Sequence, residues 1–154
     1  MDIGGSPEEI RAQATRVRAW AAELEGTRDD VRSGYGVRWV GVAAERYRDR
    51  LHEHARAVAE RREELLGLAQ DLDALADELE ERQAAIRRAA QAVQDAVDGA
   101  RRTVGRLWDV AADALSDGER AARRTAERVL DTVGDLPPFG SPRWLDLEKE
   151  LGRR

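Results

Sequence analysis

The chain of 154 residues has no cysteine, a single lysine and a single phenylalanine, and only 5% of its residues are aromatic. Without cysteine it can form neither disulfide bonds nor thiolate metal sites. So few aromatic side chains, among 37% charged residues, do not supply a thick globular core. This composition is typical of long exposed helices that meet along a narrow apolar seam. We therefore expect an all-α protein that depends on a partner for part of its burial.

Two kinds of membrane-related segment are also missing from the sequence. No stretch approaches the ~20 consecutive apolar residues that a membrane-spanning helix needs. The N-terminus lacks the succession of basic, apolar and small residues that marks a Sec signal peptide. If the protein is exported, we expect it to leave the cell by another route.

The side chains needed for catalysis do not come together in the sequence. The only histidines, His52 and His54, are two residues apart, so on a helix they diverge by about 200° and cannot share a metal ion. No glycine-rich phosphate loop precedes a helix, and the serines fit caps and turns. We therefore expect a non-enzymatic protein with no metal, no cofactor and no small-molecule substrate.

Charge is unevenly distributed along a chain of net charge −5. Nine acidic residues and two arginines lie within 60–81, whereas seven arginines and five acidic residues lie within 101–130. On helices such runs usually form solvated faces, or they set the register of a partner. The arginine-rich run lacks interleaved aromatic residues for base stacking, so nucleic acid is not an expected partner.

The first predicted helix begins at Ser6-Pro7-Glu8-Glu9, where serine can cap, proline suits the first helical position, and Glu9 completes a capping box. Apolar residues then recur on one helical face as far as Val31. The spacing predicts a helix from about Pro7 to Arg32. We expect Gly34 to close it in a left-handed conformation and Gly41 to let two helices approach closely.

The second predicted helix carries apolar residues at seven-residue intervals from Leu51 to Leu107, which is coiled-coil geometry. Gly67 does not change the phase of this pattern, so we interpret it as a tolerated glycine; Gly99 and Gly105 are the better candidates for a bend. The first helix can cover the second only to about Gly67. A second copy, a paralogous hairpin or the chain's own later segment must cover the remainder, because each leucine left in water forfeits ~2 kcal/mol.

The expected partner interface follows from this seam on both helices. It comprises Ile10, Val17, Leu24, Val31, Leu51, Val58, Leu65, Leu68, Leu72, Leu75, Leu79, Ile86 and Val93.

The C-terminal part of the chain is punctuated by turn residues. Ser116 and Glu119 can form a second capping box, Gly118 can end the preceding helix, and Gly134 with Pro137-Pro138 can end the next one. Trp144 begins a short amphipathic segment. We expect a helical hairpin over 6–98, a helical extension over 99–134, and a proline-containing tail with a short helix over 135–154.

The corner between the first two helices carries a recognisable pattern: Trp39-Val40-Gly41, then Ala43-Ala44, then Tyr47. Trp39, Gly41, Ala43, Ala44 and Tyr47 resemble the corner of the WXG-type (ESAT-like) helical hairpins of type VII secretion. The opening from Gly5 to Ile10 resembles the start of the related N-terminal targeting domains of actinobacterial type VII substrates. The resemblance covers roughly residues 6 to 95.

This resemblance implies an antiparallel helical hairpin that pairs with itself or with a paralogous hairpin into a four-helix bundle. It implies a protein made in the cytoplasm and exported, folded and dimeric, by the type VII (ESX-like) machinery to the cell surface or beyond. The chain would act as a secreted substrate, a targeting subunit or a carrier subunit. The five corner residues would be structural and recognition residues rather than catalytic ones.

The sequence departs from the family in one respect. The export signal of the family has the form Tyr-x-x-x-Asp or Glu, but here Trp39 follows Tyr35 and Leu51 follows Tyr47 at that spacing. Either a partner supplies the signal, or the chain is not exported. The alternative function is an intracellular coiled-coil scaffold or dimerisation protein. Because the residues after Gly118 are too few and too polar for a catalytic core, we expect an accessory or carrier subunit, or the N-terminal part of a longer toxin.

Overall fold

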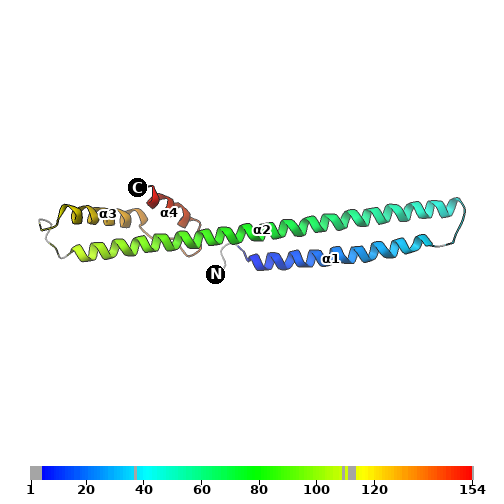
Figure 1. The fold of residues 1–154 in the computed structure, drawn as a ribbon, viewed down its shortest axis with the longest axis horizontal. Helices are drawn as coiled ribbons and strands as arrows, with labels where there is room; N and C mark the ends of the chain where they lie inside the picture. The colour runs from blue at the N-terminus through cyan, green and yellow to red at the C-terminus, as the bar shows by residue number, and fades with distance from the viewer. Residues whose placement is uncertain (1–4, 37, 109, 111–113, 154) are drawn as a thin grey trace. The chain divides into compact units, whose positions relative to one another are not determined.

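The computed structural model describes residues 5–36, 38–108, 110 and 114–153. Its elements in chain order are helix α1 (Pro7–Ser33), a short 3-10 helix η1 (Gly34–Gly36), and helices α2 (Val42–Trp108), α3 (Asp117–Val133) and α4 (Arg143–Gly152) (Figure 1). No strand occurs in these described ranges. The predictions of an all-α chain and of a long second helix are therefore confirmed.

The contacts divide the chain into two compact units. We call residues 5–79 the N-terminal unit and residues 80–153 the C-terminal unit. Helix α2 contributes its first part to one and its last part to the other. The boundaries expected from the sequence, after residues 98 and 134, both fall inside the C-terminal unit.

In the N-terminal unit, α1 lies antiparallel to the first part of α2 (Figure 1). Ion pairs between the two helices establish the direction, because partners that come later in α1 come earlier in α2. These pairs are Arg11 with Asp77 at 2.7 Å, Arg18 with Asp73, and Glu25 with Arg62 at 2.8 Å. All three lie near the surface, so they fix register more than they add stability.

The core of the N-terminal unit is narrow and made of small side chains. Ala14 and Val17 of α1 pack with Ala69 of α2, and Leu65 and Leu72 close over them. Alanine at the contact lets the two helix backbones come close, since no larger side chain holds them apart. The unit is thus held by a thin apolar seam, as the composition predicts.

The prediction that α1 covers α2 only to Gly67 is wrong, because α1 reaches as far as Asp77. The end of α1 faces Leu51 of α2, not the first residues of that helix: a Cβ on Gly34 would lie 3.2 Å from Leu51 Cδ1. Residues 42–50 therefore extend past the end of α1. This offset moves the contact between the helices toward the C-terminus of α2.

In the C-terminal unit, the later part of the chain folds back onto α2 (Figure 1). Val133 of α3 and Trp144 and Leu147 of α4 are buried in one cluster with the inward-facing residues of α2, which are Ile86, Ala89, Ala90, Val93 and Val97. The Trp144 indole Nε1 donates a hydrogen bond to the Pro138 carbonyl oxygen at 3.1 Å. Of the three covers that the sequence left open for this part of the seam, the structure uses the chain's own later segment.

The helix starts follow the predicted serines. The Ser116 hydroxyl accepts from the Glu119 backbone N–H at 3.3 Å, and the Glu119 carboxylate accepts from the Ser116 backbone N–H at 2.8 Å, so the second capping box is confirmed. At Ser6 only half of the predicted box forms. The Ser6 hydroxyl accepts from the Glu9 backbone N–H but donates to the Glu8 carboxylate at 2.9 Å.

Both helix starts lower the pKa of a carboxyl group. The pKa of Glu119 is lowered, first by the hydrogen bond from the Ser116 hydroxyl and then by the Ser116 backbone N–H. The pKa of Glu8 is lowered, first by its own backbone N–H and then by the Ser6 hydroxyl. In each case the donor stabilises the ionised carboxylate.

Glycines have different effects in different helices. Helix α2 continues through Gly67, which confirms its interpretation as a tolerated glycine, and it continues through Gly99 and Gly105 as well. The prediction that Gly118 ends a helix is wrong. Helix α2 ends at Trp108, and Gly118 lies in the first turn of α3. Gly134, with a φ of 53°, follows the last residue of α3, as predicted.

Candidate interaction surface at the helical corner

In the turn between α1 and α2, Gly34 and Gly41 have the opposite roles from those that the sequence predicts. Gly34 has a right-handed conformation with a φ of −63°, because the chain continues from α1 into η1 instead of reversing there. A side chain at Gly34 would meet Leu51 at 3.2 Å and the Tyr47 hydroxyl at 3.7 Å. Gly34 therefore permits close approach. Gly41, with a φ of 107° and no neighbour near its Cβ position, supplies the left-handed conformation.

Helix α2 begins at Val42, directly after this glycine, and its first turns carry the rest of the predicted motif. The backbone N–H of Glu45 donates to the Gly41 carbonyl at 3.1 Å, which starts the helical hydrogen bonding. Ala44 is 1% exposed, whereas Ala43 faces solvent. The two motif alanines thus divide between the inside and the outside of the corner.

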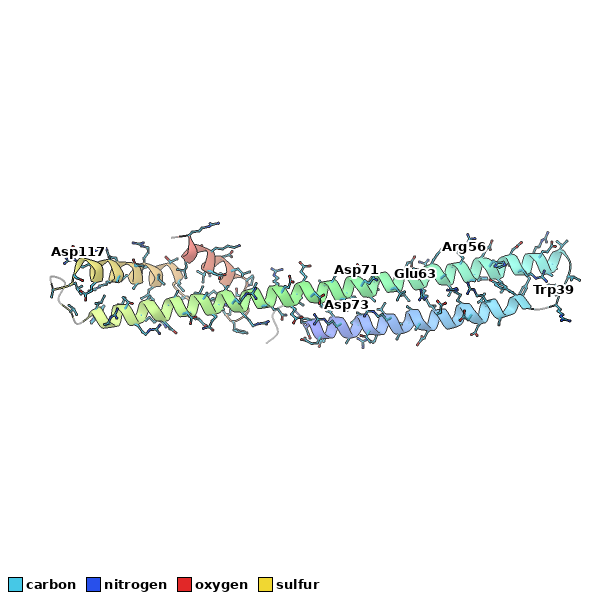
Figure 2. The ribbon with its side chains drawn as sticks, in the orientation of Figure 1. Trp39, Arg56, Glu63, Asp71, Asp73 and Asp117 are labelled. Carbon is cyan, nitrogen blue, oxygen red and sulfur yellow. The ribbon has the colours of Figure 1, made fainter. Side chains whose placement is uncertain are left out.

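Trp39 and Tyr47 form an aromatic pair at the end of the N-terminal unit. Their ring centroids are 6.0 Å apart with an interplanar angle of 56°. The Arg48 guanidinium donates a hydrogen bond to the Trp39 carbonyl at 2.6 Å, which ties the loop to α2. Figure 2 shows Trp39 on the turn between α1 and α2. The Trp39 side chain remains 46% exposed and that of Tyr47 41% exposed.

The aromatic pair belongs to a larger exposed apolar area. Val40 and Val42 beside it are 90% and 64% exposed. A shallow hollow of about 440 Å³ on α2 is lined by Val42, Ala43, Arg46, Tyr47 and Arg50. We call Trp39, Val40, Val42 and Tyr47 the corner surface. Contiguous exposed apolar groups with a polar rim are typical of protein-binding sites, and tryptophan, tyrosine and arginine are enriched at them.

The residues that the sequence predicts to face a partner fall into three classes of solvent exposure. Val17, Ile86 and Val93 are buried inside the chain. Leu68 and Leu75 are 47% and 51% exposed. The others are partly buried: Ile10, Leu24, Val31, Leu51, Val58, Leu65, Leu72 and Leu79. Most of the predicted interface therefore lies along contacts that the chain makes with itself.

The exposed members define a second surface, which the seven-residue pattern alone did not single out. Trp20, Leu68 and Leu75 are each the residue immediately before a buried alanine: Ala21, Ala69 and Ala76. Each therefore flanks the buried seam on the same side of its own helix. In an antiparallel pair, equivalent flanks of the two helices lie on one common face. We call these three residues the flank surface, and the one-before-alanine position is the signal that identifies it.

In the described part of the chain, no three or more histidine, cysteine, aspartate or glutamate side chains are placed to hold a metal ion. The His52 ring packs on Tyr35 with centroids 4.4 Å apart, and His54 is exposed. The pKa of Arg61 is raised, chiefly by its hydrogen bond to Glu64. That pair lies on the exposed surface of α2.

In comparisons with known proteins, no family model, no curated protein and no solved structure matches this chain. Within the ranges that the structure describes, no helix combines the length and the apolar character needed to cross a membrane.

Proposed function

We propose that this chain is a non-enzymatic helical protein of type VII secretion, acting as an exported substrate, targeting subunit or carrier subunit. In this proposal, the N-terminal unit is the helical hairpin that pairs with a second hairpin, either its own copy or a paralogue, into a four-helix bundle. The corner motif is the part that the export machinery or the partner recognises.

The exposure of the corner surface is the observation that carries the proposal. A tryptophan that served only to hold two helices together would be buried, because covering its ring is worth several kcal/mol. Trp39 instead keeps nearly half of its surface accessible, next to two exposed valines. Its ring is held against Tyr47 and its carbonyl against Arg48, so it is presented in one orientation. An anchored but exposed aromatic side chain suits recognition.

The flank surface supports the bundle part of the proposal. Trp20, Leu68 and Leu75 lie on one face of the paired helices and are about half exposed. A second antiparallel pair laid against this face would bury them, since four-helix bundles bury apolar residues that two helices leave open. The pairing of hairpins thus requires no opening of the α1 and α2 contact.

The experiment is an immunoblot of culture filtrate and cell lysate for the tagged full chain in its native host, with and without the type VII secretion ATPase. We expect the protein in the filtrate only when the ATPase is present. A cytoplasmic marker that stays in the cells excludes lysis. Retention in both strains would contradict export and leave the intracellular coiled-coil scaffold as the function.

A pair of variants tests the role of the corner. Trp39→Ala is expected to abolish export while leaving the helical circular dichroism spectrum unchanged and the melting temperature nearly so. Trp108→Ala removes a tryptophan that is 70% exposed, at the end of α2, and serves as the matched control. We expect its export to equal that of the parent chain. Equal export of both variants would show that Trp39 has no recognition role.

A further inference from the structure

A basic groove lies on the N-terminal unit, separate from the corner and flank surfaces. Its wall consists of Arg28 and Arg32 of α1, Tyr35 of η1, and residues of α2, which are His52, Ala55, Arg56 and Ala59. The groove has a volume of about 610 Å³, which is within the usual range for small-molecule sites. Figure 2 labels Arg56 on this stretch of α2. Among the residues that the structure describes, three arginine side chains and no carboxylate line the groove.

The nearby acidic residues neutralise these arginines only in part. Glu25 pairs with Arg28 at 2.8 Å and also lies 2.8 Å from Arg62 Nε, while Arg62 has a second carboxylate partner in Glu63. Asp29 approaches Arg32 only at 4.0 Å. Among the described residues Arg56 forms no hydrogen bond or ion pair. An excess of positive charge therefore remains at the groove of a chain that is acidic as a whole.

Tyr35 gives the groove a second, independent feature. Its hydroxyl is buried and, among the described residues, has no hydrogen-bond partner. A buried polar group is normally satisfied, so an orphan hydroxyl in the wall of a groove points to a partner that is not part of the chain. The Tyr35 ring packs against the His52 ring with centroids 4.4 Å apart and an interplanar angle of 34°, which holds it in place.

We propose that this groove binds a phosphate group, carried by a small molecule or free as an oligophosphate. Guanidinium groups bind phosphate through paired, charge-assisted hydrogen bonds. A wall of three arginines favours a doubly charged phosphate over a singly charged carboxylate. The anion also supplies the acceptor that the Tyr35 hydroxyl lacks. The packed rings of Tyr35 and His52 offer an aromatic wall for an organic part of the ligand. This proposal does not depend on export.

The test is isothermal titration calorimetry of the full chain, at low ionic strength, with pyrophosphate, phenyl phosphate and acetate. We expect saturable binding of the two phosphates and at least tenfold weaker binding of acetate. Tighter binding of phenyl phosphate than of pyrophosphate would identify an organic phosphate as the ligand class. Tighter binding of pyrophosphate would identify a free oligophosphate. If neither phosphate binds saturably, or if acetate binds equally well, the proposal is overturned.

Variants locate the binding in the groove. Arg32→Gln and Arg56→Gln are each expected to weaken phosphate binding by about tenfold, because each removes a charge-assisted contact. Tyr35→Phe keeps the stacking ring and removes only the hydroxyl, so a smaller loss of about fivefold is expected. Arg16→Gln removes the same charge from an exposed position on α1 outside the groove. If Arg16→Gln weakens binding as much as Arg56→Gln, the attraction is diffuse and no groove site exists.

Discussion

Trp144 provides the sharpest test of how the C-terminal unit is held together. It is 2% exposed, packs in the cluster that contains Val93 and Leu147, and donates its indole N–H to the Pro138 carbonyl. Replacing a buried tryptophan with alanine typically costs 3–5 kcal/mol, because transfer free energy is lost and a cavity remains. We therefore expect Trp144→Ala to destabilise the packing of α3 and α4 on α2 by about this amount. Trp144→Phe keeps most of the ring and loses the hydrogen bond, for which about 1 kcal/mol is expected.

Native-state hydrogen exchange measures this effect segment by segment. Since every 1.4 kcal/mol changes an equilibrium tenfold, the amides of α3 and α4 should exchange at least a hundredfold faster in Trp144→Ala. The control is Trp108→Ala, which removes an exposed ring that has the Arg123 guanidinium 5.9 Å from its centroid. Its cost should stay below about 1 kcal/mol. Equal exchange in the two variants would refute the assignment of Trp144 to the core.

Two further predictions concern the backbone and a helix cap. Gly41→Ala should lower the free energy of unfolding by ~1–3 kcal/mol in thermal or urea unfolding, because a φ of 107° is strained for any residue with a Cβ. Gly26→Ala, in the interior of α1 with open space around it, should instead raise that free energy by ~1 kcal/mol. Changes of the same sign in the two variants would contradict the turn geometry. Ser116→Ala should raise the pKa of Glu119, followed by NMR titration of its carboxyl. Because the folded pKa is lowered, the cap stabilises the fold above the unfolded pKa of the carboxyl group, and this stabilisation is lost as the pH falls through the folded pKa. An unchanged Glu119 titration in Ser116→Ala would exclude the hydroxyl as the main cause of the lowered pKa.

The sequence was sufficient to predict the local elements. Helix ends at Ser6, Ser116 and Gly134 depend on interactions among residues three or four apart, which the sequence displays directly. The length of α2 followed from an apolar repeat that Gly67 does not disturb. At the candidate site, the sequence singled out Trp39 and Tyr47 as corner residues. It did not show their exposure, because exposure depends on which helix faces cover one another.

Register was harder to predict because it is a property of two helices at once. Whether Gly34 or Gly41 bears the left-handed conformation depends on where the chain reverses, and here it continues from α1 into η1 at Gly34 and reaches a positive φ only at Gly41. The coverage of α2 by α1 as far as Asp77 follows from the same offset. Predicting the flank surface also requires the register, since only the identity of the buried alanines shows which neighbouring residues remain exposed.

The burial of the apolar seam bears on the choice between the two functions. A scaffold that dimerised along the whole seven-residue repeat would use Ile86 and Val93, which the C-terminal unit buries beneath Trp144 and Leu147. Such a dimer must first release α4 from α2, which exposes the Trp144 ring at a cost of several kcal/mol. Association through an already exposed surface carries no such cost, because nothing has to open. The energetics therefore favour partners that dock on the corner and flank surfaces, as a hairpin paired into a bundle would, over a continuous homodimeric coiled coil.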